Sequence, residues 1–224
     1  MYTLYHHIIC PFSRKIRFLL SQKEIEFDLV KENFWERKKE FLALNAAGRV
    51  PVLFDLHNQY PICGSSAIAE YIEEKHDDSK NYFGESLAQR AETRRLQAWF
   101  DEKFYNEVSK HFLQERFFNR LTGGGAPNPE ILRLAKHNLN IHINYLEFLL
   151  ENRKYLSGDQ ITIADFSAAG HISSLDYFGD IEWKNRDAVK EWYSLVKSQK
   201  GFADILRDLV SGSEPSNHYS KLDF

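Results

Sequence analysis

The strongest candidate for chemistry in this sequence is a cysteine, Cys10, which begins the motif Cys10-Pro11-Phe12-Ser13. Proline is favoured at the first position of a helix because it has no N–H to leave unpaired, so Cys10 is expected directly at a helix start. The helix dipole and free amides there stabilise a thiolate. The motif therefore predicts a nucleophilic thiol with a depressed pKa. Further positive potential is expected from three basic neighbours, Arg14, Lys15 and Arg17.

The same motif limits the redox chemistry of the site. Ser13 stands where a dithiol motif would have its second cysteine, so any redox step would be monothiol. The alternative is that Cys10 is a small buried apolar residue at a strand end. The only other cysteine, Cys63, is expected in an inner strand and to react more slowly. Two cysteines are too few for a cysteine-built metal site, and no metal is predicted.

Two further motifs could bind an extended, peptide-like ligand. Pro51, at the start of a predicted strand, suggests a cis Val50–Pro51 bond, which would leave the backbone of Val50 free to pair with such a ligand. An ordinary trans proline at a strand edge is the alternative. Ser65 and Ser66 open a predicted helix, where hydroxyls and free amides would form a nest for a carboxylate.

Short strands and helices must position these residues in the N-terminal third of the chain. Strands over 2–5 and 25–30 are predicted to be parallel because a helix over 11–22 joins them. A hairpin is expected from 50–54 and 60–63. Two more helices are predicted, over 36–44 and 65–75.

The rest of the chain is predicted to be helical. Apolar residues recur every fourth position over 87–121, which predicts one long, bent helix, and a second helix is expected over 130–150. Thr162 and Asp165 have the spacing of a capping box, so Asp165 is interpreted as structural. A last helix is predicted over 187–200, ended by Gly201.

Composition excludes several classes of protein. The 224 residues are 43% hydrophobic, so a sizeable core is expected and whole-chain disorder is excluded. A net charge of −3 gives no reason to expect a nucleic acid partner. No apolar run approaches the ~18 residues of a membrane span, and a cytoplasmic protein is predicted. Its expected parts are two domains, 1–76 and 87–210, and a flexible tail, 211–224.

Taken in order, these motifs resemble the glutathione S-transferase superfamily. The resemblance rests on the Cys10 motif, residues 45–53, residues 65–68 and residues 158–165. It implies an α/β thioredoxin-like N-terminal domain followed by an all-α C-terminal domain. It also implies that Cys10 is the thiol that forms mixed disulfides with glutathione, as in omega- and beta-type relatives.

The resemblance implies a glutathione site as well. The residue at Val50 pairs with the cysteinyl backbone, the residue at Ser65 holds the γ-glutamyl carboxylate, and Arg37 lies where some relatives place a lysine for the glycyl carboxylate. The residues implied for glutathione binding are Phe12, Arg37, Val50, Pro51, Ser65 and Ser66. One departure weakens the site. Relatives usually carry Glu or Gln just before the serine, whereas this chain has Gly64. Losing that contact costs about ten- to a hundredfold in affinity.

A narrower resemblance is to the FtsZ-binding subgroup, bacterial division proteins built on a dimeric transferase fold. It rests on residues 99–104, 175–180 and 218–224. It implies a homodimer across the long helix, where Trp99, Phe100, Phe104 and Tyr105 would form an exposed apolar patch. It also implies FtsZ filaments as a partner, with the tail interpreted as a docking peptide rather than a packed end.

Two functions follow from these patterns. The first is a dimeric FtsZ-binding module whose glutathione cleft is weakened. The second is an enzyme, a glutathione-dependent thiol transferase or reductase that uses Cys10. A weaker third option is a conjugating transferase in which Ser13 or Tyr5 activates bound glutathione.

Overall fold

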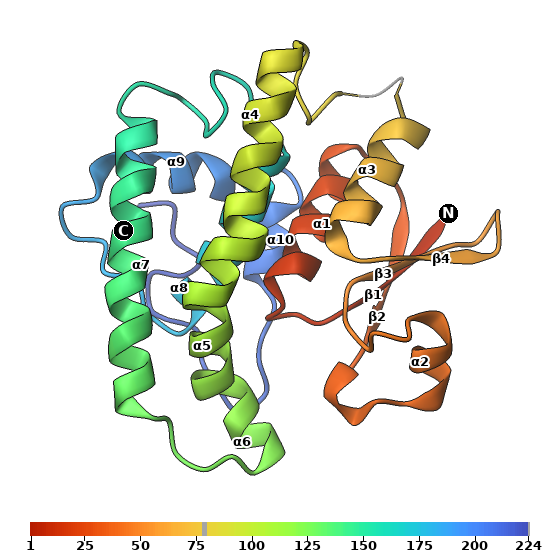
Figure 1. Cartoon of the computed structure of the whole chain (residues 1–224), viewed down its shortest axis with the longest axis horizontal. Helices are drawn as coiled ribbons and strands as arrows, with labels where there is room; N and C mark the ends of the chain where they lie inside the picture. Colours follow the sequence, from red (N-terminus) through yellow and green to blue (C-terminus); the bar gives the residue numbers. More distant parts are fainter. Residues whose placement is uncertain (78–79, 224) are drawn as a thin grey trace.

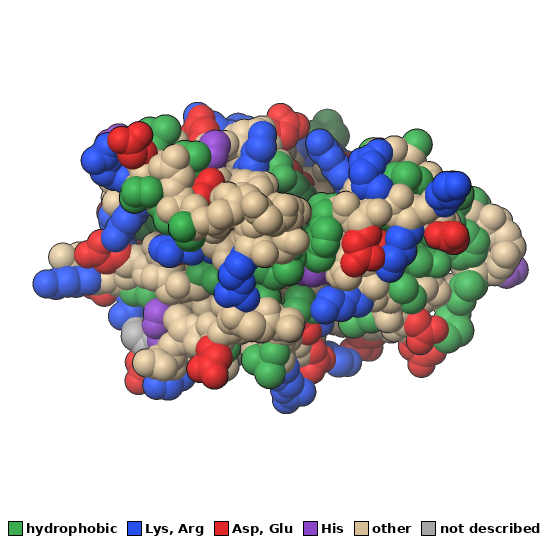
Figure 2. Space-filling model, turned by 90° about the horizontal axis from the view of Figure 1, so that it is seen from below, with side chains coloured by type: hydrophobic (Ala, Val, Ile, Leu, Met, Phe, Trp, Pro, Cys, Tyr) green, Lys and Arg blue, Asp and Glu red, His purple; other side chains and the backbone are tan. Residues whose placement is uncertain are grey.

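The computed structural model describes residues 1–77 and 80–223. A four-stranded sheet with its helices forms the N-terminal part, at the right of Figure 1, and a larger helical part lies at the left. The predicted fold class, a thioredoxin-like α/β domain followed by an all-α domain, is confirmed. On the face turned toward the reader in Figure 2, acidic and basic side chains are interspersed, in line with the small net charge of −3.

The sheet has the order β2-β1-β3-β4. β1 runs parallel to β2 and antiparallel to β3, as the predicted connections require. β4 is an edge strand, so the inner position predicted for Cys63 is wrong. The elements are β1 (Tyr2–His6), α1 (Pro11–Gln22), β2 (Phe27–Lys31), the 3-10 turn η1 (Phe34–Glu36), α2 (Lys39–Leu44), β3 (Val52–Asp55), β4 (Tyr60–Cys63) and α3 (Ser65–Lys75).

The predicted long helix is one continuous helical run over 87–122. Two stretches of it, η2 and η3, are wound as π-helix, a form that often occurs at functional sites. The run consists of α4 (Leu87–Ala98), η2 (Trp99–Ser109), α5 (Lys110–Leu113), η3 (Gln114–Phe118) and α6 (Asn119–Thr122). The remaining helices are α7 (Pro129–Leu150), α8 (Ile163–Tyr177), α9 (Asp187–Lys197) and α10 (Phe202–Leu206).

The last predicted helix ends earlier than expected. α9 stops at Lys197, and Gly201, with φ of +82°, precedes α10 instead of closing the helix over 187–200. Its positive φ is easy for glycine and strained for other residues, so Gly201 marks a change of direction between two helices.

α8 is the central helix of the molecule, and every one of its residues is buried. The predicted capping box of Thr162 and Asp165 is present at its start. α8 packs closely on α1: a Cβ added at Gly170 would lie 2.5 Å from the backbone oxygen of Pro11. Through this contact, α1, the helix that follows Cys10, packs directly on the helical part.

The exposed aromatic patch predicted on the long helix is wrong. Phe100 and Phe104 are 0% exposed because they face α7 and α8 in the core. Several exposed apolar side chains lie instead on α7, on the left of Figure 1, where Leu134, Ile141 and Phe148 follow one another at intervals of seven residues. Such spacing places them on one face of the helix.

The C-terminal segment is packed against the molecule, so the predicted flexible tail is wrong for the residues up to 223. Tyr219 is 1% exposed, and Ser216 donates its backbone N–H to the carbonyl of Tyr177. The physical reason is that this segment carries an aromatic residue and hydrogen-bonding groups whose partners lie far away in the sequence. Among the described helices, none is long and apolar enough to cross a membrane.

Candidate ligand-binding cleft

A cleft of about 310 Å³ lies between the start of α1 and the long helical run. From the N-terminal part it is lined by Cys10, Phe12 and Val50, and from the helical part by Asp101, Tyr105 and Phe118. One wall is aromatic, because Phe34 meets Phe118 edge to face with ring centroids 5.6 Å apart. Residues from both parts of the chain therefore build one concave surface, the usual form of a small-molecule site.

Cys10 lies directly before α1, as predicted, but its thiol is not activated in this structure. The Sγ–H donates to the carbonyl of Val50 across 3.8 Å. Burial raises the pKa of the Cys10 thiol, and this effect outweighs the lowering by the amides and hydroxyl of the following turn. The predicted depressed pKa is therefore wrong, because the helix start is desolvated as well as positively polarised.

Two of the three basic neighbours of Cys10, Lys15 and Arg17, explain part of this result, since their charges are paired with carboxylates elsewhere. The Lys15 ammonium lies 2.5 Å from the Asp101 carboxylate, and its side chain is fully buried. Arg17 forms an ion pair with Asp208, and Arg14 donates its Nε–H to a backbone carbonyl, that of Ile8. These side chains hold α1 in place. The charges of Lys15 and Arg17 are partly neutralised by their partners, whereas the charge of Arg14 acts to lower the pKa of the Cys10 thiol.

Asp101 is the acidic centre beneath the cleft. Burial on its own raises the pKa of Asp101, but Lys15 and His171 hold it at about 2. His171 lies 3.8 Å away and also hydrogen bonds to Ser109. The carboxylate is therefore ionised and paired, which indicates a structural ion pair at the floor of the cleft rather than a general base.

The predicted alternatives to Cys10 are not brought to the cleft. The Ser13 hydroxyl is fully buried and accepts a hydrogen bond from the backbone N–H of His7 at 3.3 Å. Tyr5 lies in β1 and packs against Phe41, with ring centroids 6.1 Å apart. Neither side chain lines the cleft, although the Ser13 hydroxyl reaches the Cys10 thiol and acts to lower its pKa.

The predicted glutathione-binding residues are divided between the cleft and its surroundings. Phe12 and Val50 line the cleft, and the Val50–Pro51 bond is cis, as predicted. Ser65 begins α3 and is buried, whereas Ser66 is exposed and accepts a hydrogen bond from Gln97 at 3.3 Å. Arg37 is exposed and does not contribute to the cleft lining. Their roles toward glutathione stay predictions.

Gly64 shows why a side chain is difficult at this position. Its φ is +91°, in the region that L residues rarely adopt, although a Cβ there would meet no atom within 4 Å. The position is therefore open in space and strained in backbone. Gly64 therefore has two effects. It removes the acceptor for the γ-glutamyl amino group, and it allows the turn into α3 without backbone strain.

Sequence reasoning missed the cleft residues of the helical part. Tyr105 packs edge to face on Phe12 at 4.9 Å, and burial raises the pKa of its hydroxyl. Asp101 and Tyr105 are four residues apart and so share a helix face, a signal that could have placed them together. Which way that face points could not be known without the packing of the two parts. Among the described residues, no three His, Cys, Asp or Glu side chains gather as a metal site.

Known proteins share both the sequence and the fold of this chain. The family model for the glutathione S-transferase N-terminal domain matches residues 9–75, and that for the C-terminal domain matches residues 130–206. FtsZ-localized protein A of Caulobacter vibrioides is 42% identical over 224 residues, which cover 99% of this chain and 98% of that protein. The chain belongs to the glutathione S-transferase superfamily. The predicted resemblance is thereby confirmed.

Two solved structures match this superfamily member along its whole length. One is a glutathione S-transferase from Rhodospirillum rubrum, with a TM-score of 0.96, 41% identity and full coverage of both chains. The other is FzlA from C. crescentus, with a TM-score of 0.96, 41% identity, and coverage of 100% of this chain and 99% of that one. The fold of this chain is therefore shared by a protein named as a glutathione S-transferase and by one named FzlA.

Proposed function

We propose that this protein is a cytoplasmic, homodimeric cell-division factor that binds FtsZ filaments and has a weakened glutathione site. The observation that carries the proposal is 42% identity over the whole chain to a relative named for its localisation with FtsZ. Two features of the cleft support the weakened glutathione site. Gly64 offers no acceptor, and Cys10 is held as a protonated thiol by burial and by Val50.

Co-pelleting with polymerised FtsZ tests the proposal. The wild-type protein is expected in the pellet when GTP drives polymerisation and in the supernatant with GDP. Cys10→Ala removes only a small side chain inside the cleft, so pelleting is expected to stay within about twofold of wild type. Absence from the GTP pellet, or dependence of pelleting on Cys10, would contradict a filament-binding role separate from thiol chemistry.

The exposed stripe of α7 supports the homodimer. Leu134, Ile141 and Phe148 are each more than half exposed on one face of the helix, and exposed apolar side chains gathered on one face are typical of interaction surfaces. The free protein is expected to sediment at about twice its 26.3 kDa chain mass. A monomeric mass would remove the dimer from the proposal and leave filament binding to be judged by co-pelleting.

The second candidate is a glutathione-dependent thiol transferase that uses Cys10. The observation that favours it is the position of Cys10 in a cleft between Phe12 and Tyr105, in a fold shared with a glutathione S-transferase. In thiol–disulfide exchange, the Cys10 thiolate would attack the glutathione sulfur of a mixed disulfide, which breaks that S–S bond, releases the other sulfur as a thiolate and leaves glutathione in a disulfide with Cys10. Glutathione turnover by the wild-type protein without FtsZ association would favour this candidate.

A substitution at Gly64 separates a weakened site from a closed one. Gly64→Glu is expected to tighten glutathione by roughly tenfold, because it supplies a charged acceptor for the γ-glutamyl amino group. The backbone strain at φ +91° is present with and without ligand, so it lowers the melting temperature rather than the affinity. Calorimetric titration of glutathione measures the effect. Gly64→Ala is the matched control, because it carries the same strain without the acceptor. Equal affinities in the two variants would show that other changes close the site.

A further inference from the structure

The segment after α10, residues 207–223, crosses from the helical part to the start of α1 without regular secondary structure. We call it the C-terminal strap. Two of its side chains meet α1: Asp208 forms an ion pair with Arg17, and the ring of Tyr219 lies 5.8 Å from the Arg14 guanidinium carbon. The strap therefore contacts the same helix that begins at Cys10.

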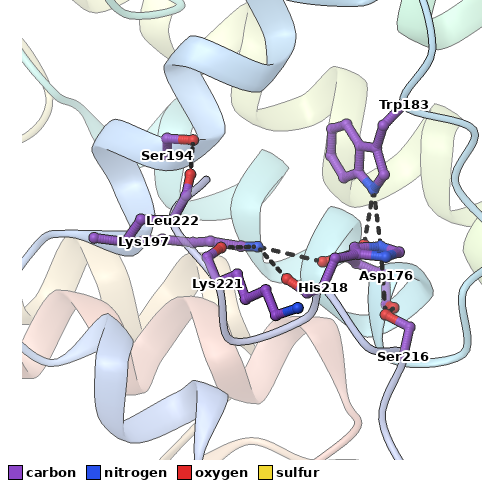
Figure 3. Close-up of polar contacts among 8 residues, drawn as sticks. All are labelled: Asp176, Trp183, Ser194, Lys197, Ser216, His218, Lys221 and Leu222. Carbon is purple, nitrogen blue, oxygen red and sulfur yellow. Dashed lines mark hydrogen bonds and ion pairs between the residues drawn. The ribbon is translucent and has the colours of Figure 1, made fainter. Parts of the chain in front are cut away.

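The strap is also anchored next to Tyr219, by a buried carboxylate, Asp176 of α8. Figure 3 shows His218 of the strap and Trp183 converging on this carboxylate, at 2.8 and 3.0 Å. In the same view, the Lys197 ammonium of α9 donates to two strap carbonyls, those of His218 and Lys221. Most of the anchoring is thus made by side chains, which can open without unfolding a helix.

Arg14 connects the strap to the thiol. Its side chain is fully buried, its Nε–H donates to the carbonyl of Ile8 at 2.7 Å, and its backbone N–H donates to the carbonyl of Cys10 at 3.0 Å. One residue thereby fixes both sides of the turn that presents Cys10. The Tyr219 ring covers the guanidinium and lies against Tyr177, with centroids 5.2 Å apart. Displacing the strap would expose Arg14 to water and release this turn.

We propose that the C-terminal strap is a conformational device that sets the accessibility of Cys10. With the strap docked, Tyr219 holds Arg14, and Arg14 holds the Cys10 turn closed against Val50. With the strap displaced, the turn is freed, and Cys10, which is partly exposed in the cleft while the strap is docked, becomes more accessible to solvent and to electrophiles. Arg14 and Tyr219 are positioning residues in this device. The proposal goes beyond FtsZ binding and does not depend on it.

The test compares the two cysteines of the full chain. Cys63 lies in β4, outside α1 and the strap, and serves as the internal reference. Iodoacetamide labelling of each thiol is followed by mass spectrometry, and the ratio of the Cys10 rate to the Cys63 rate is measured. Tyr219→Ala is expected to raise this ratio roughly fivefold or more, because the loss of about 1 kcal/mol of docking energy would increase the population of the open Cys10 turn by that factor. Leu222→Ala is the matched control in the strap, since its side chain is 51% exposed, and it should leave the ratio unchanged.

A general loss of stability would accelerate both thiols, so an unchanged ratio in Tyr219→Ala overturns the proposal, whether or not the absolute rates rise. His218→Ala removes the contact of the strap with Asp176 at a partly exposed residue and is expected to raise the ratio in the same direction by a smaller factor. If Tyr219→Ala does not fold, His218→Ala decides the question by the same ratio.

Discussion

Replacing Asp165 by alanine is expected to destabilise the fold by about 3–5 kcal/mol, because several buried donors would lose their acceptor. Asp165 is fully buried. One carboxylate oxygen accepts from the backbone N–H of Leu156 and the indole N–H of Trp192, both at 2.9 Å. The other accepts from the backbone N–H and the hydroxyl of Thr162, at 2.8 and 3.1 Å. Alanine would leave these donors buried without an acceptor.

Chemical unfolding at pH 7 measures this effect. Asp165→Asn keeps the shape but turns one acceptor into a donor, so an intermediate loss is expected. Asp159→Ala is the control, because that residue is exposed on the same loop and should change stability by less than about 0.5 kcal/mol. A loss of similar size in Asp165→Ala and Asp159→Ala would contradict the structural role of the capping box.

Stability is expected to fall by several kcal/mol between pH 6.5 and pH 4 because two histidines are buried in neutral form. Burial, together with nearby positive charge, lowers the pKa of His6 to about 3 and that of His7 to about 4. In the unfolded chain both titrate near pH 6.5, so the unfolded state binds more protons between these values. The contribution of the two neutral histidines to the free energy of unfolding is complete above pH 6.5 and is lost as the pH falls toward their folded-state pKa values. Because a tenfold change in proton affinity is worth ~1.4 kcal/mol, the lowered pKa of His7 alone accounts for about 3 kcal/mol.

Urea unfolding at a series of pH values between about 7.5 and 4.5 measures this slope. His7→Phe removes one titrating ring from an aromatic site next to Trp35 and Phe117, and is expected to roughly halve the slope. His137→Gln changes an exposed histidine on α7 and should leave the slope as in the wild type. A wild-type stability that is flat over this range would contradict the neutral burial of these rings.

The sequence by itself determined the elements whose signals are local. Pro11 marks the start of α1 and the box of Thr162 and Asp165 marks the start of α8, because helix capping depends on residues within one turn. The parallel pairing of β1 and β2 followed from the helix between them. The order of these motifs was also sufficient to identify the superfamily.

Only the tertiary structure decided what surrounds those elements. Cys10 lies at a helix start as its motif predicts, but its pKa depends on burial, which lies outside the motif. Lys15 pairs with Asp101, 86 residues away, and Arg17 pairs with Asp208, 191 residues away, so their charges serve packing rather than the thiol. The C-terminal segment is likewise docked by a contact between residues distant in the sequence, that of Tyr219 with Arg14. Backbone conformation at a helix start depends on neighbouring residues. The dielectric environment and the charge at a site depend on groups that only folding brings together.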